Sequence, residues 1–252
     1  MSGEPVTILP ESTDFRPRMR RRLRRIHRSA ILRRLLHWRQ LDFEFASWQM
    51  LYLIVSPKRV YRNIYYHKQT KNQWARDDPA FVLLLVAGIC AITCAYSVVY
   101  EVGMAGFLKA LVQLLVVNFV VSGLILATAS WVTANRFLRH RSVHSAEQRV
   151  EWQYAFDVHC NGFFVFFVMA YVLQFFFLPV LMKTSWISLF LGNTVFALAG
   201  AGYAYVTYLG FQAMPFLQHQ EVFLYLVPLV AVVYLASLFG FNVSHHVIDY
   251  YF

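Results

Sequence analysis

Charged side chains are scarce in this sequence and are missing altogether from long stretches. Only 14% of the 252 residues are Asp, Glu, Lys or Arg, whereas about a quarter is typical of a soluble domain. Five blocks contain none of them, at residues 79–100, 110–135, 158–182, 184–220 and 222–241. Because a helix of about 20 apolar residues can cross the hydrocarbon of a bilayer, the sequence predicts an all-α, polytopic membrane protein with five transmembrane helices. Blocks of this length disfavour a stack of buried soluble helices.

Residues that carry redox or catalytic chemistry are also few. The three cysteines, Cys90, Cys94 and Cys160, lie inside or at the end of apolar blocks and indicate no disulfide framework. Cys90 and Cys94 are one helical turn apart, but no His or second Cys pair lies nearby, so we interpret them as structural thiols. The sequence contains no P-loop, dinucleotide fingerprint, HExxH or GxSxG motif. We therefore expect no cofactor, no metal and no enzymatic activity.

The predicted spans lack buried charges in their middle, which disfavours a proton-coupled pump or an ion-coupled transporter. Many transporters are built from inverted repeats, and no such repeat is visible in an odd set of five spans. A few polar side chains do occur in the spans, at Gln113, Asn118, Gln174 and Asn193. A small transporter or channel lined by these residues is therefore the alternative function.

The N-terminal region is strongly basic. Residues 16–39 hold 11 of the 23 Lys and Arg, with apolar residues recurring at helical spacing. This pattern predicts an amphipathic helix that lies on an anionic membrane, docks an acidic partner or binds RNA phosphates. A simpler interpretation is a charge cluster that fixes this end in the cytosol. The candidate lipid- or partner-binding residues are Arg20, Arg21, Arg22, Arg24, Arg25, Arg28, Arg33 and Arg34.

Three regions follow from this pattern. Residues 1–78 form a cytosolic basic region with amphipathic and interfacial helices, residues 79–241 a five-span membrane domain, and residues 242–252 a short lumenal tail. The apolar segment 41–56 is too short to span, and residues 57–78 have a membrane-surface composition. The predicted spans are 80–100, 109–131, 162–181, 187–209 and 222–241. Asp78 is the expected N-cap of the first span, with Pro79 at its first helical position.

The basic residues are distributed asymmetrically between the two ends of the predicted spans. If the N-terminus is cytosolic, 21 of the 23 Lys and Arg lie on that side, 17 before the first span and four in the connection at 132–161. Only Lys109 and Lys183 lie on the other side. The asymmetry predicts a cytosolic N-terminus and a lumenal C-terminus. No signal peptide is visible, so we expect the first span to act as an uncleaved anchor.

The stretch "EWQYAFDVHCNGFF" at 151–164 places carboxylates, His, Cys and Asn at the start of the third span. On a helix, Asp157 and His159 point about 200° apart and are not a local acid–base pair. We therefore expect capping, interhelical bonds or a protein partner for the polar residues of this stretch instead of catalysis. The residues concerned are Glu151, Trp152, Asp157, His159 and Asn161.

Four stretches resemble the uncoordinated-50 family of Golgi membrane proteins. They are "LDFEFASWQMLYLIVSPKRVYRN", "KQTKNQWARDDPAF" with Asp77 and Asp78, "EWQYAFDVHCNGFF", and "GNTVFALAGAGYAYVTYLGFQAMPFL" with Asn193. The resemblance runs in order from about residue 41 to residue 226 and covers the Arg-rich arm in less detail.

The resemblance implies a five-span Golgi protein, also found at the inner nuclear membrane, with a cytosolic N-terminus. It further implies a role in delivering nicotinic acetylcholine receptors to the cell surface. A fungal relative partners Sec7-type exchange factors of Arf GTPases, and RNA binding is attached to a mammalian relative. The expected partners are therefore membrane lipids, a Sec7-type exchange factor, receptor cargo and RNA.

Overall fold

The structure is a computed structural model that describes residues 41–71, 74–140 and 148–251. The chain divides into two compact units, Met1–Leu41 with Asp77–Pro79, and Asp42–Arg76 with Ala80–Phe252. All helices discussed below belong to the second unit. The Arg-rich arm and its eight candidate arginines lie outside the described residues.

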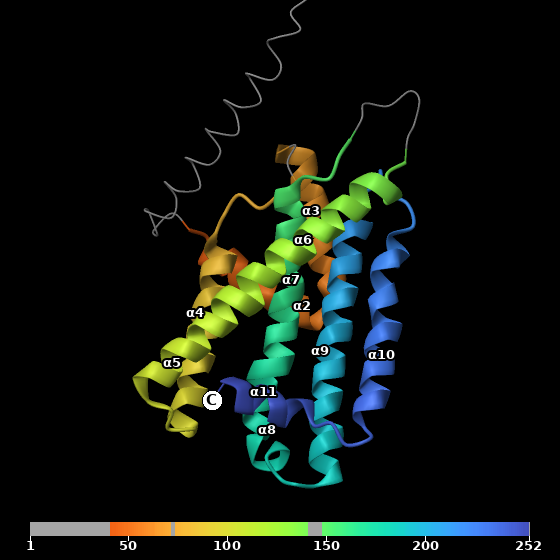
Figure 1. Ribbon diagram of the computed structural model, residues 1–252. Coiled ribbons are helices and arrows are strands. Elements are labelled where there is room, and N and C mark those ends of the chain that lie inside the picture. The colour runs from red at the N-terminus through yellow and green to blue at the C-terminus, as the bar shows by residue number, and fades with distance from the viewer. Residues whose placement is uncertain (1–40, 72–73, 141–147, 252) are drawn as a thin grey trace, which may run out of the picture. The chain divides into compact units, whose positions relative to one another are not determined.

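Within residues 41–71, 74–140 and 148–251, five helical rods are long and apolar enough to cross a membrane (Figure 1). Their bounds are Ala80–Val99 (α4), Gly103–Leu138 (α5, η2, α6 and η3), Trp152–Leu181 (α7, η4 and α8), Trp186–Gln212 (α9) and Gln220–Ser237 (η5 and α10). The described residues form no strand, only an isolated bridge between Arg139 and Leu217. The predicted fold class, an all-α polytopic membrane protein with five spans, is confirmed.

The second and third rods extend beyond the charge-free blocks. They contain 36 and 30 residues, which at 1.5 Å per residue gives about 54 and 45 Å. A hydrocarbon core of about 30 Å is shorter than either, so these rods tilt or project into the headgroup region and beyond. An α-helix satisfies its backbone hydrogen bonds internally and has no reason to end where the hydrocarbon ends. For this reason the connection between the second and third rods is shorter than predicted. The sequence predicts it at residues 132–161, and it lies at residues 139–151.

The rods α7 (Trp152–Phe167) and α9 lie at the centre of the bundle. Figure 1 shows α5 and α6 (Ser122–Thr133) crossing α7 obliquely, and α10 (Leu226–Ser237) running beside α9. Gly210 lets α9 approach its neighbours, because an added Cβ there would lie 2.7 Å from Val158 and 3.3 Å from Tyr61. A small residue is therefore required where α9, α7 and α3 meet.

In the described part of the chain, two shorter helices precede the first span. α2 (Phe43–Val55) is capped by Asp42, whose side chain accepts a hydrogen bond from the Phe45 N–H at 2.8 Å. Its 13 residues span about 20 Å, too short to cross a bilayer. It packs against α4 and α7, and α3 (Pro57–Lys71) packs against α9. The helix α4 begins at Ala80, one residue later than an Asp78 cap requires, because the first turn of a helix frays.

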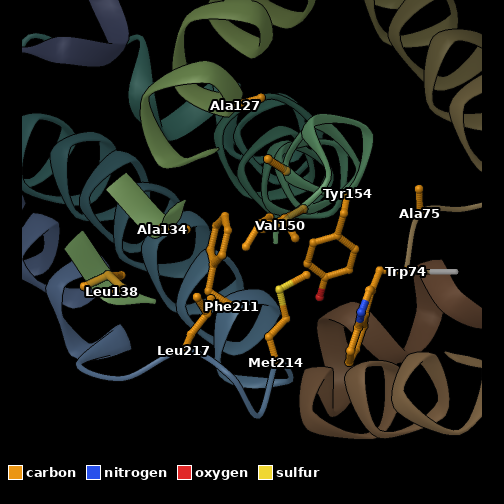
Figure 2. Close-up of a cluster of buried hydrophobic side chains, with 12 residues drawn as sticks. Trp74, Ala75, Ala127, Ala134, Leu138, Val150, Tyr154, Phe211, Met214 and Leu217 are labelled. Atoms are coloured by element: carbon orange, nitrogen blue, oxygen red, sulfur yellow. The ribbon is translucent and has the colours of Figure 1, made fainter. Parts of the chain in front are cut away.

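One end of the bundle holds residues 74–76 before α4, residues 139–140 after η3 (Ala134–Leu138), residues 148–151 before α7, and residues 213–219 between α9 and η5 (Gln220–Tyr225); we call it the basic end. A buried apolar cluster fills it (Figure 2). Trp74 packs edge-on against Tyr154, with ring centroids 5.9 Å apart, and against Phe216. The connections are joined by backbone hydrogen bonds, because the N–H of Gln218 donates to the Leu138 carbonyl at 2.8 Å. The basic end is thus a packed part of the protein.

Candidate functional site

A polar cluster joins the segment before α4 to α7 at the basic end; we call Tyr61, Arg76, Asp157 and Asn161 the Arg76 cluster. The Arg76 backbone N–H donates to Asp157 Oδ2 at 2.6 Å, and Arg76 Nη2 donates to Asn161 Oδ1 at 2.7 Å. Asn161 Nδ2 donates in turn to the Tyr61 hydroxyl at 3.3 Å. Two residues one helical turn apart on α7 therefore hold both α3 and the residue 76 segment.

The position of the Arg76 cluster along α7 follows from the cost of burying charge. Asp157 is the last charged residue before the block 158–182, so the cluster lies where the hydrocarbon begins. The guanidinium of Arg76 also lies 4.1 Å from the centre of the Phe81 ring, a favourable cation–π distance. The hydrogen bond to Asn161 and the contact with Phe81 offset part of the desolvation of Arg76, whose Nη1 is buried without a hydrogen-bond partner among the described residues.

Tyr61 closes the cluster on the α3 side. Its side chain is buried beside Gly210 of α9. Burial raises the pKa of the Tyr61 hydroxyl above its ordinary value, while the hydrogen bond from Asn161 and the charge of Arg76 partly offset that rise. Tyr61 is therefore a neutral, buried hydrogen-bond acceptor that links α3, α7 and α9.

His159 belongs to a different contact from Asp157, as the helical spacing predicts. Its Nδ1 lies 2.9 Å from the Tyr203 hydroxyl on α9, and its Nε2 lies 3.2 Å from the Phe119 carbonyl oxygen. The ring fits against Gly123, where an added Cβ would lie 2.7 Å from it. With both ring nitrogens bonded between helices, His159 joins the second, third and fourth rods.

The remaining residues singled out in the sequence lie at separate places. Glu151 precedes α7 without a side-chain cap bond, and Trp152 Nε1 donates to Thr128 Oγ1 at 3.0 Å. Asn193 Nδ2 donates to Ser237 Oγ at 2.9 Å, and its Oδ1 accepts from the Val243 N–H. Asp77 and Asp78 lie in the segment before α4. Among the candidates that the structure describes, Asp157 and Asn161 come together in one cluster.

Sequence reasoning did not single out Tyr61, Arg76 or Asn135. Asn135 holds the segment that precedes α7, because its Oδ1 accepts from the Val150 N–H at 3.0 Å and its Nδ2 donates to the Val150 carbonyl. Arg76 did carry a signal, since it is the last cation before the first charge-free block. Tyr61 and Asn135 carry none, because Tyr and Asn are ordinary near membrane ends.

The Arg76 cluster has the chemistry of a structural clamp. Among the described residues, no group of three or more His, Cys, Asp or Glu could hold a metal ion. The thiol of Cys160 is buried on the same helix, and the histidine on its helix, His159, is bonded to Tyr203 and Phe119. The cluster contains a carboxylate and a guanidinium, which hydrogen bonds fix in place. What it can do is hold the surface formed by α3 and the residue 76 segment in one position.

Comparison with known proteins places the chain in a family. The UNC-50 family model matches residues 31–252. The chain belongs to the UNC-50 family. The protein unc-50 homolog of Dictyostelium discoideum is 43% identical over 225 residues, covering 87% of this chain and 85% of that protein. The Homo sapiens homolog is 43% identical over 222 residues, with the same two coverages. The homolog A of Xenopus laevis is 41% identical over 222 residues.

No solved structure matches the chain. The matched range, 31–252, contains every helix described above, so the five-span bundle belongs to the part of the sequence that the family shares. The resemblance stated from four sequence stretches is therefore confirmed, and the chain is a multi-pass membrane protein of this family.

Proposed function

We propose that this protein is a non-enzymatic trafficking factor of the Golgi membrane that works through a cytosolic basic end. In this proposal the basic end recruits a Sec7-type exchange factor of Arf GTPases and supports surface delivery of receptors such as nicotinic acetylcholine receptors. The N-terminus is cytosolic, the C-terminus is lumenal, and a second pool resides at the inner nuclear membrane. Membership in the UNC-50 family supports the class of protein.

The observation that carries the proposal is the exposed basic surface of α3. Lys58, Arg59 and Arg62 are all exposed there, and the Arg59 guanidinium lies 5.5 Å from the centre of the Tyr52 ring. At the other end of the bundle Lys109 and Lys183 belong to different segments of the chain, whereas these three cations of α3 lie within five residues of one another. A concentrated positive surface attracts an acidic protein surface or anionic lipid and accelerates association.

The Arg76 cluster gives this surface a defined shape. Tyr61 is next to Arg62 in α3, and its buried side chain is bonded to Asn161 of α7. Because α3 is anchored through Tyr61 and packs on α9, its cations project from a fixed helix. A preorganised surface loses less conformational entropy when a partner binds.

Charge reversal tests the proposal. We expect the triple variant Lys58→Glu, Arg59→Glu, Arg62→Glu to lower membrane recruitment of a Sec7-type exchange factor and surface delivery of the receptor about tenfold, by repelling an acidic partner. Recruitment is measured by co-sedimentation with Golgi membranes, and delivery by surface labelling. The matched control is Lys109→Glu with Lys183→Glu, which reverses charge at the opposite end and should leave both measurements unchanged.

Equal recruitment by the two variants, at equal protein levels, would exclude α3 as the recruiting surface. Protease protection of tags on the two termini tests the proposed orientation separately. No observation among the described residues specifically favours the two alternatives drawn from the sequence, a small transporter or channel and an RNA-binding protein. Asn118 and Asn193 are engaged in hydrogen bonds between helices, and the arginines of the RNA hypothesis lie outside the described residues.

A further inference from the structure

A small cavity lies between the first three rods and the helix α11, in the half of the bundle away from the basic end. We call it the Gln174 cavity; residues of α4, α5, η2, η4, α8 and α11 line it. It contains about 20 Å³ of space for the centre of a water-sized sphere, which holds about one water molecule or one hydroxyl group. The helix α11 (Val243–Tyr251) covers one side of it through Ile248 and Tyr251.

Gln174 is the polar group that faces this cavity without a partner. It is 1% exposed, and neither its amide nitrogen nor its amide oxygen has a hydrogen-bond partner among the described residues. A buried amide in this condition costs about 1–3 kcal/mol unless something binds it. Neighbouring hydroxyl groups are already engaged, since Thr93 donates to the Ile89 carbonyl and Tyr96 to the Tyr171 carbonyl.

The lining determines the chemistry of an occupant. The described residues that line the cavity include no Lys, Arg, Asp, Glu or His, so a charged group would enter without compensation. The Gln174 amide offers one acceptor and one donor side by side, and a hydroxyl group offers a matching donor and acceptor. The other lining side chains include Ile92, Leu114 and Ile248, which suit an apolar carbon body next to that hydroxyl.

The position of the cavity also fits a lipid. Gln174 lies seven residues before the end of α8 at Leu181, about 10 Å along the helix, and Tyr96 lies three residues before the end of α4. Uncharged lipid hydroxyls reside at this shallow depth, just below the headgroups. Two π-helical segments, η2 (Gln113–Val121) and η4 (Val168–Leu173), contribute lining residues, and such segments occur frequently at functional sites.

We propose that the Gln174 cavity binds the hydroxyl of an uncharged membrane lipid, whose apolar body lies along the lining helices. A sterol and a diacylglycerol share this chemistry. A lone water molecule has the same hydrogen-bonding groups without the apolar body. The experiment below distinguishes a bound lipid from bound water.

The test uses the full-length protein in phosphatidylcholine vesicles with photo-crosslinking analogues of cholesterol or dioleoylglycerol. We expect crosslinks near Gln174 or Tyr96, reduced about tenfold by Gln174→Leu, because that change removes both hydrogen-bonding groups. Ala110→Leu fills the cavity from α5 while leaving Gln174 in place, and should reduce crosslinking similarly. The matched control Gln212→Leu changes an exposed Gln at the basic end and should crosslink as the unaltered protein does.

The hydroxyl itself is tested by competition. Unlabelled cholesterol should compete with the probe, and its methyl ether should compete about tenfold less well, because the ether cannot donate a hydrogen bond. Equal competition by the two compounds would overturn the proposal, as would unchanged crosslinking of both cavity variants. Water as the occupant predicts that neither lipid raises the unfolding temperature of the protein, and that result would also overturn it.

Discussion

Asn161 and Gln174 are two amides on the same helical rod with opposite surroundings. Each is 1% exposed. Asn161 binds Arg76 and Tyr61 through its oxygen and its nitrogen, whereas neither amide atom of Gln174 has a partner among the described residues. The two amides are therefore equally buried but contribute to stability in opposite directions. A satisfied amide stabilises the fold, and an unsatisfied amide leaves capacity for a ligand.

The contrast extends to the two ends of the bundle. At the basic end, Trp74, Asn135 and the Arg76 cluster join segments distant in sequence. Away from it, α11 closes over a cavity. We infer that the basic end is built for a fixed surface and the other half for an exchangeable occupant. Each of the following variants tests that comparison.

The largest effect is expected from removing a tryptophan at each end in turn. Trp74 is 8% exposed in the apolar cluster, while Trp186 is 63% exposed at the start of α9. Trp74→Ala should lower the free energy of unfolding by about 3–5 kcal/mol, because it opens a cavity that the cluster cannot refill. Trp186→Ala should cost less than about 1 kcal/mol. Thermal unfolding in detergent measures both, and similar losses would contradict the comparison of the two ends.

The two amides give the next test. Asn161→Leu should lower the free energy of unfolding by about 2–4 kcal/mol, because Arg76 and Tyr61 lose a buried partner. Gln174→Leu, measured in lipid-free detergent, should be neutral or stabilising, because an unsatisfied amide is replaced by an apolar group. Asn63→Leu, at an exposed position of α3, controls for added apolar surface. A Gln174→Leu loss as large as that of Asn161→Leu would show that Gln174 is bonded within the protein.

Two glycines distinguish close packing at the basic end from ordinary packing elsewhere. A Cβ at Gly210 would lie 2.7 and 2.8 Å from the methyl carbons of Val158, whereas a Cβ at Gly88 would meet Phe167 at 3.5 Å. Gly210→Ala should therefore cost about 1–3 kcal/mol by overpacking. Gly88→Ala should be neutral or stabilising by up to about 1 kcal/mol, because Ala favours the helix. Unfolding temperatures in one detergent compare the pair, and a tolerated Gly210→Ala would refute tight packing there.

The sequence predicts the helical bundle well and the Arg76 cluster and the Gln174 cavity poorly. Five charge-free blocks suffice for the fold class because hydrocarbon imposes one simple rule on helices. Spacing also separates Asp157 from His159 correctly, since both lie on one regular helix. The pairing of Asn161 with Arg76 depends on the packing of segments 85 residues apart, which no local pattern encodes. The same holds for Gln174, a visible polar residue whose lack of partners emerges only when α4, α5 and α11 surround it.

The smallest expected effect is a pH dependence that isolates Tyr61. Removing its hydroxyl in Tyr61→Phe leaves Asn161 Nδ2 without this acceptor and should cost about 0.5–1.5 kcal/mol near pH 8. Burial raises the pKa of Tyr61 in the folded protein, so its contribution is complete below pH of about 10, the ordinary value of tyrosine. Above that pH the unfolded chain releases the proton first, and stability falls by up to about 1.4 kcal/mol per pH unit for this group.

Tyr61→Phe removes that fall, so the variant should approach the stability of the unaltered protein near pH of about 11 and exceed it at higher pH. Unfolding temperatures between pH 8 and about 12 measure the crossing. Tyr66→Phe, at a side chain that is 56% exposed on the same helix, should run parallel to the unaltered protein throughout. A parallel curve for Tyr61→Phe as well would mean that Tyr61 is solvated, and the Arg76 cluster would then lack its bond to α3.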